Sequence, residues 1–62
     1  MTRAHATRQL LALGPLTFRD YWAITGWPEK IARKVLGRQV ELQRVRLFRE
    51  PGTHRSFYGL AR

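Results

Sequence analysis

Apolar positions in the first half of the chain predict two helices. Residues 3–13 are mostly good helix formers, and Gly14-Pro15 ends this helix, because Gly and Pro are typical just beyond a helix C-terminus. A second helix is expected over residues 17–25, with Thr17 as its N-cap and Gly26 at its end. Its large side chains recur at helical spacing and, together with Trp27, are expected to fill the core: Phe18, Tyr21 and Trp22.

A third helix is expected over residues 28–42. Pro28 suits the first helical position, and Glu29 complements the positive helix N-terminus. At about 100° per residue, one face is mostly apolar and is expected to pack on the core: Ile31, Ala32, Val35, Leu36, Gln39 and Leu42. The other face is mostly basic: Lys30, Arg33, Lys34, Gly37, Arg38 and Glu41. Because like charges at i,i+4 repel, this basic face favours a binding role over a merely solvated one.

Near the C-terminus the spacing of apolar residues changes from a helical period to a period of two, because apolar and basic residues alternate in RVRLF before Pro51-Gly52. This pattern predicts a β-hairpin over residues 44–60 with a loop at 51–54. The expected register places Glu50 opposite Arg55, Phe48 opposite Phe57, Leu47 opposite Tyr58, and Val45 opposite Leu60. One face would then pack on the helices with Val45, Leu47, Tyr58 and Leu60, while the other carries Arg46, Phe48 and Phe57.

Size and charge narrow the classes of partner. The chain has 62 residues, enough for one small domain, and no Cys for a disulfide or a Cys-type zinc site. Twelve Lys and Arg stand against four acids, so the net charge is +8 at pH 7. This excess of one sign is typical of proteins with a polyanionic partner, and Arg, the commoner base here, matches phosphate and guanine edges with its fork of donors. We therefore expect a nucleic acid partner.

The residues give no sign of a catalytic, metal or cofactor site. The four acids are scattered over different elements, no Gly-rich phosphate loop occurs, and His5 and His54 lack patterned acids. No apolar run approaches the roughly 20 residues of a membrane span, and the N-terminal apolar segment is too short for a signal peptide. We expect a cytoplasmic protein that is not an enzyme and takes no cofactor, metal or small-molecule ligand.

The stretches LTFRDYWAITGWPEKIARKVLGRQVELQRVRLFRE and FYGL resemble the winged helix-turn-helix family, and the resemblance covers nearly the whole chain. It implies an α+β fold of three helices and a C-terminal β-hairpin wing, in a single domain over residues 1–62. In that family the third helix lies in the DNA major groove, and the wing touches the flanking backbone or minor groove. Such motifs usually have a small residue where Trp22 stands. We therefore expect the helix crossing either to shift by one residue or to open, with Trp22 filling the gap.

The resemblance implies contacts with double-stranded DNA. Arg33, Lys34 and Arg38 would enter the major groove, where Arg can bond guanine bidentately. The other contacts would anchor the phosphate backbone: Lys30, Arg3, Arg8, Arg49, Thr53, His54 and Arg55. One small domain offers a modest interface, so we expect tight binding to need a homodimer or neighbouring copies on DNA. Size and charge resemble small phage and plasmid regulators, which implies a transcriptional regulator or an excisionase-like architectural factor.

Other partners stay open at this point. A winged helix can also be a protein-interaction module, in which case the basic face would meet an acidic protein partner. The Phe48 and Phe57 side chains would support that role, although they could equally be covered by the N-terminal segment or contact a second copy of the chain. RNA is a third partner, disfavoured by the absence of an RNP-like strand or a GxxG loop.

Overall fold

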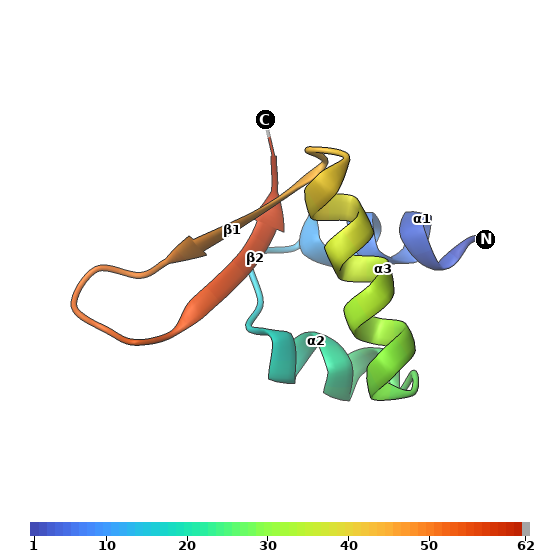
Figure 1. The fold of residues 1–62 in the computed structure, drawn as a ribbon, viewed down its shortest axis with the longest axis horizontal. Helices are drawn as coiled ribbons and strands as arrows, with labels where there is room; N and C mark the ends of the chain where they lie inside the picture. Colours follow the sequence, from blue (N-terminus) through green and yellow to red (C-terminus); the bar gives the residue numbers. More distant parts are fainter. Residues whose placement is uncertain (62) are drawn as a thin grey trace.

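The computed structural model describes residues 1–61 and contains three helices followed by a two-stranded antiparallel sheet (Figure 1). The elements are α1 (Arg3–Leu11), α2 (Phe18–Thr25), α3 (Glu29–Glu41), β1 (Val45–Arg49) and β2 (Ser56–Leu60). This is the α+β layout of a winged helix, so the predicted fold class is confirmed.

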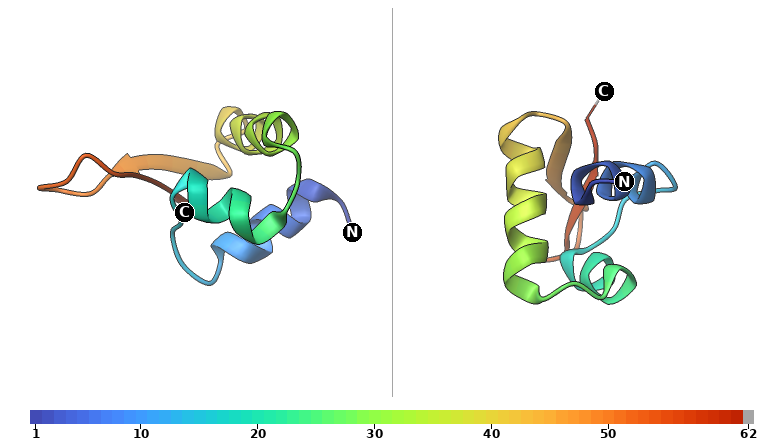
Figure 2. Two further views of the ribbon diagram at one scale, coloured as in Figure 1. Left: turned by 90° about the horizontal axis from the view of Figure 1, so that it is seen from below. Right: turned by 90° about the vertical axis from the view of Figure 1, so that its right-hand side faces the viewer.

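The helices and the hairpin occupy different parts of the molecule. α3 forms one side of the helical part, and α1 and α2 lie on the other side (Figure 2). The hairpin projects away from them, and its loop forms one end of a molecule that measures 35 × 24 × 20 Å (Figure 1). Both the outer side of α3 and the hairpin loop therefore face solvent. Within residues 1–61, no helix combines the length and the apolar character needed to cross a membrane.

Local hydrogen bonds set the ends of α1 and α2. α1 ends at Leu11, two residues before the predicted end, because the chain turns there and the Gly14 N–H bonds to the Leu11 carbonyl at 3.1 Å. Thr17 caps α2 as predicted, since its hydroxyl accepts from the Asp20 N–H at 3.2 Å. Gly26 ends α2 in the left-handed conformation with φ 67°, which a side chain would disfavour.

α3 is one residue shorter at each end than the predicted range 28–42, because Pro28 takes the N-cap position and Leu42 the C-cap position. Beyond the C-cap, Gln43 adopts φ 60°, and its N–H bonds to the Val40 carbonyl at 3.0 Å. The Arg44 N–H bonds one residue further back, to the Gln39 carbonyl at 3.0 Å. These two bonds form a Schellman motif in which Gln replaces the usual Gly.

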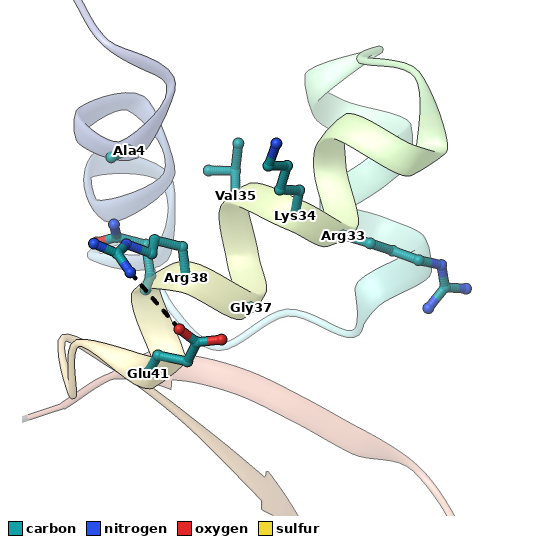
Figure 3. Close-up of a pocket in the computed structure, with 8 residues that line it drawn as sticks. Ala4, Arg33, Lys34, Val35, Gly37, Arg38 and Glu41 are labelled. Carbon is teal, nitrogen blue, oxygen red and sulfur yellow. Dashed lines mark ion pairs between the residues drawn. The ribbon is translucent and has the colours of Figure 1, made fainter.

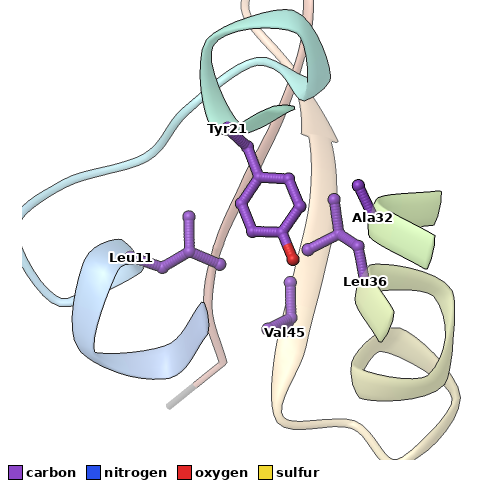
Figure 4. Packing of buried hydrophobic residues seen from close by; sticks show 5 residues of the cluster. All are labelled: Leu11, Tyr21, Ala32, Leu36 and Val45. Atoms are coloured by element: carbon purple, nitrogen blue, oxygen red, sulfur yellow. The ribbon is translucent and has the colours of Figure 1, made fainter. Parts of the chain in front are cut away.

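The core is small and takes one or two residues from each of four elements: Leu11, Tyr21, Ala32, Leu36 and Val45. Figure 4 shows these side chains gathered around the Tyr21 ring. Thr7 is also fully buried, and its hydroxyl donates to the Arg3 carbonyl and accepts from the Tyr21 hydroxyl, both at 2.8 Å. Burial raises the pKa of Tyr21 above 10.0, and the Thr7 hydrogen bond opposes this only in part.

Trp22 does not join the core, so its predicted burial is wrong. Its side chain is 39% exposed, and its indole N–H donates to the Trp27 carbonyl at 2.7 Å. Phe18 stacks on it with ring centroids 6.2 Å apart. The neighbouring Tyr21 fills the buried position, while Phe18 and Trp27 are half-buried against the core. Trp22 therefore does not plug the helix crossing.

The inner face of α3 agrees with the predicted face in part, because Ile31 and Val35 are only half-buried and Leu42 is exposed. Ala32, Leu36 and Gln39 are buried as expected. Leu42 was expected on the same face but is 42% exposed, because it lies at the C-cap where the chain leaves the helix. Val40 packs against the core in its place.

The hairpin has the predicted register. Val45 pairs with Leu60, Leu47 with Tyr58 and Phe48 with Phe57, and the Glu50 N–H bonds to the Arg55 carbonyl at 3.3 Å. Leu16 adds a short segment to the free side of β2, because its N–H and carbonyl both bond to Tyr58, at 3.0 and 2.7 Å. The segment between α1 and α2 is thus joined to the hairpin.

Only the base of the hairpin packs firmly on the helices. Val45 is buried, but Leu47, expected on the same packed face, is 52% exposed because the hairpin extends beyond the helices. On the other face, the Phe48 and Phe57 rings stack with centroids 6.1 Å apart, and Pro15 lies beside them. The segment before α2 thus covers part of this aromatic pair and leaves Phe48 39% exposed.

Candidate nucleic-acid interface

The outer face of α3 carries four basic side chains: Lys30, Arg33, Lys34 and Arg38. All four are exposed, as predicted, because the opposite face of the helix is occupied by Ala32 and Leu36 in the core. The amphipathic pattern of α3 therefore separates a core face from a charged face.

Arg33 is held in place by two other side chains. Its guanidinium carbon Cζ lies 4.3 Å from the centroid of the Phe18 ring, which α2 supplies. One turn earlier in α3, Glu29 Oε2 accepts hydrogen bonds from Arg33 Nε at 3.2 Å and from Nη2 at 2.9 Å. The Arg33 side chain nevertheless remains 63% exposed. The guanidinium group is therefore both oriented and accessible.

Arg38, one to two turns further along α3, is held much less firmly. Its nearest acid is Glu41, with Nη1 and Oε2 3.8 Å apart. The two side chains are 67% and 74% exposed, and ion pairs between side chains so exposed contribute little. Arg38 is thus free to reorient towards a ligand.

A hollow of about 630 Å³ lies along the side of α3 next to Ala4 of α1, and Gly37 is among its lining residues. Lys34 and Arg38 are among its lining residues, and Figure 3 shows Arg38 pointing to the side of α1 while Arg33 points away from it. A Cβ atom added at Gly37 would meet nothing within 4 Å. The backbone of α3 can therefore be approached closely at Gly37.

The N-terminal arginines have contacts within the fold that the sequence did not indicate. Arg8 Nη1 donates to Gln39 Oε1 at 2.9 Å, and Gln39 is only 2% exposed. Arg8 is half-buried and satisfies a buried amide, so it has a structural role beside the predicted phosphate contact. Arg3 is exposed, with its guanidinium carbon 5.8 Å from the centroid of a Trp27 ring.

The predicted wing residues lie at the far end of the hairpin and are all exposed: Arg49, Thr53, His54 and Arg55. The Thr53 hydroxyl is used inside the loop, where it donates to the Glu50 carbonyl and accepts from the Arg55 N–H, both at 3.2 Å. Figure 1 shows this loop at one end of the long axis, while α3 lies apart from it in the helical part of the molecule. The predicted contact residues therefore form two separate basic groups rather than one.

Arg19 is a further basic residue that the sequence did not single out. It is exposed in the first turn of α2 and lines a hollow together with Arg55 and Ser56 of the hairpin. Arg19 thus lies beside the basic group of the hairpin. No spacing in the sequence relates residue 19 to residue 55, so only the fold brings them together.

Residues 1–61 contain neither a cluster of metal ligands nor a buried polar side-chain atom without a partner. No group of three His, Cys, Asp or Glu side chains lies close enough to hold a metal ion. Every buried side-chain nitrogen or oxygen in this range has a hydrogen-bond partner.

Comparison of the chain with protein-family models, curated proteins and solved structures gives no match. The order of the elements and the pairing of β1 with β2 are what define the winged-helix layout of this chain.

Proposed function

We propose that this protein binds double-stranded DNA through the outer face of α3. The observation that carries the proposal is the set of exposed basic side chains on a helix whose opposite face is anchored in the core. An α-helix fits the major groove of B-DNA, and a chain with net charge +8 is attracted to its phosphates.

Each group of side chains has a distinct part in the proposed complex. Arg33, Lys34 and Arg38 enter the major groove, and Lys30 holds an adjacent phosphate. The hairpin end contacts the flanking backbone through Arg49, Thr53, His54 and Arg55. Arg3 and Arg19 add further phosphate contacts. The interface of one such domain is small, so tight binding requires a homodimer or adjacent copies, as in a transcriptional regulator or an architectural factor.

The test is direct binding to duplex DNA at several salt concentrations, followed by selection of bound sites from a random pool. We expect the logarithm of the binding constant to fall with the logarithm of salt, with a slope of about −0.9 per phosphate neutralised. The double variant Arg33→Ala/Arg38→Ala should lose specific binding and keep its unfolding temperature. The matched control, Arg44→Ala/Arg46→Ala, removes the same charge outside the proposed contact. No binding of the wild type even at low salt would overturn the proposal.

A second candidate function is binding of an acidic protein. It is favoured by the stacked Phe48 and Phe57 rings, since Phe48 is 39% exposed on a strand that also carries Arg46 and Arg49. Exposed aromatic and Arg side chains are typical of protein interfaces. The salt titration and the site selection together separate the two functions, because a protein of this second kind selects no duplex sequence and keeps only charge-driven binding that salt abolishes.

A further inference from the structure

Two neighbours of Arg33 leave one edge of its guanidinium group free. Glu29 Oε2 takes the side edge, formed by Nε and Nη2. The end edge, formed by Nη1 and the outer N–H of Nη2, has no part in that interaction. Two parallel N–H bonds from an Arg edge match the O6 and N7 acceptors of guanine.

Phe18 restrains the position of the same group. The guanidinium carbon Cζ lies over the ring, 4.3 Å from its centroid, while the Arg33 side chain stays 63% exposed. The ring is itself supported, because it stacks on Trp22, and the Trp22 indole donates to the Trp27 carbonyl at 2.7 Å. Support for Arg33 thus extends from α2 to the turn before α3.

We infer that Arg33 reads a guanine through its end edge, and that Phe18 and Glu29 are positioning residues for this contact. The inference rests on the proposed DNA binding and deepens it. An Arg held before binding loses less side-chain freedom when it bonds guanine and cannot turn to the acceptors of another base, so its preference for guanine is sharper than that of a mobile Arg.

Glu29 can also contact a second nucleobase, next to the guanine that Arg33 reads. The hydrogen bonds of its carboxylate within residues 1–61 both use Oε2, which leaves Oε1 to accept from a base amino group. An acid on a surface facing phosphates is repelled by them, but in the major groove a carboxylate accepts from the N4 amino group of cytosine. The site selected by this protein therefore contains a guanine with a cytosine at the neighbouring position.

The experiment compares the base preference of the wild type with that of variants at Arg33, Phe18 and Glu29. Sites are first selected from a random duplex pool with the wild-type protein. Affinities are then measured for the selected duplex and for duplexes with each other base pair at the guanine and at its neighbour. We expect the wild type to prefer guanine by about tenfold or more. Arg33→Lys should remove this preference, because an ammonium cannot make the two parallel bonds.

The positioning residues are tested by paired substitutions. Phe18→Leu should lower the preference for guanine several-fold and leave binding to random duplex unchanged, whereas Phe18→Tyr keeps a ring and should keep the preference. Glu29→Gln should relax the choice at the neighbouring cytosine. Arg46→Lys is the matched control, because Arg46 is exposed on β1 outside the proposed contact, and it should leave the preference for guanine unaffected.

The outcomes separate this inference from the proposed function. If the wild type binds duplex but selects no guanine, or if the Phe18→Leu and Glu29→Gln variants discriminate as the wild type does, the inference is wrong and DNA binding stands. If Phe18→Leu fails to fold, two other results count against the inference. One is loss of the guanine preference in Phe18→Tyr. The other is wild-type discrimination by Glu29→Gln at both the guanine and the neighbouring cytosine. Absence of any duplex binding by the wild type overturns the proposed function itself.

Discussion

The two faces of α3 differ in how their side chains are fixed. On the inner face, Ala32 and Leu36 are held by packing from α1, α2 and β1. On the outer face, Arg33 is held by Phe18 and Glu29, while Arg38 has only a long ion pair. The same helix thus serves the core and the proposed interface, so substitutions a few residues apart should change stability and DNA binding separately.

The largest expected effect comes from the inner face. Leu36→Ala should lower the free energy of unfolding by about 2–5 kcal/mol, because Leu36 is 1% exposed and its truncation leaves a cavity. Lys34→Ala, two residues away on the outer face, should change it by less than about 0.5 kcal/mol and weaken DNA binding instead. Chemical denaturation and duplex titration of both variants measure the two effects. Equal losses of stability would contradict the separation of the faces.

Loss of the hydrogen bond between Arg8 and Gln39 should lower stability by a smaller amount, and the amount should depend on which partner is removed. Arg8→Ala should cost about 1–3 kcal/mol, because it leaves the buried Gln39 amide oxygen without a partner. Gln39→Leu should cost much less, since Arg8 is only half-buried and can turn to water. Thermal unfolding of the two variants tests this order. The reverse order would show that Arg8 is not a structural residue.

The contribution of Tyr21 to stability should depend on pH and leave DNA binding unchanged. Tyr21→Phe removes the hydrogen bond to Thr7 and should cost about 0.5–1.5 kcal/mol at neutral pH. Because burial raises the folded pKa of Tyr21 above 10.0, the unfolded chain loses this proton first. The stability due to the buried phenol is therefore complete below pH 10.0 and falls as the pH rises through the folded pKa. Denaturation at about pH 8 and about pH 11 should show the wild type losing its advantage over Tyr21→Phe; a constant difference would contradict this.

Gly37→Ala should produce the smallest change and act in opposite directions on the two properties. Nothing lies within 4 Å of the added Cβ, so the variant should gain about 0.5–1 kcal/mol of stability from reduced freedom of the unfolded chain. If DNA approaches α3 at this point, the same methyl group should weaken duplex binding. A more stable variant with unchanged affinity would place Gly37 outside the contact.

Much of the fold was predictable because its signals are local. Thr17 and Gly26 mark the ends of α2 by capping chemistry, and the alternation around Pro51-Gly52 fixes the hairpin register. The structure differs from the prediction where the sequence lacks such a local signal. The end of α3 is set by Gln43 in a conformation that usually indicates Gly. Trp22 has helical spacing but lies one position away from the buried Tyr21.

The charge of the candidate site was predictable from the sequence, but the contacts that hold its side chains in place were not. The basic face of α3 follows from helical periodicity, and the spacing of Glu29 and Arg33 permits an i,i+4 pair. The contact of Phe18 with Arg33 depends on how α2 packs on α3, and no pattern within either helix reports that. The same holds for Arg8 and Gln39, which are 31 residues apart.

The short pairing of Leu16 with Tyr58 has a mechanical consequence. Leu16 lies two residues before α2 begins, so a force applied to the hairpin tip is transmitted through backbone hydrogen bonds to the start of that helix. Hairpin and helices should therefore tilt as one rigid body when the tip is pulled. In hydrogen exchange, the amides of Leu16 and Tyr58 should open only with global unfolding, while the loop amides exchange first.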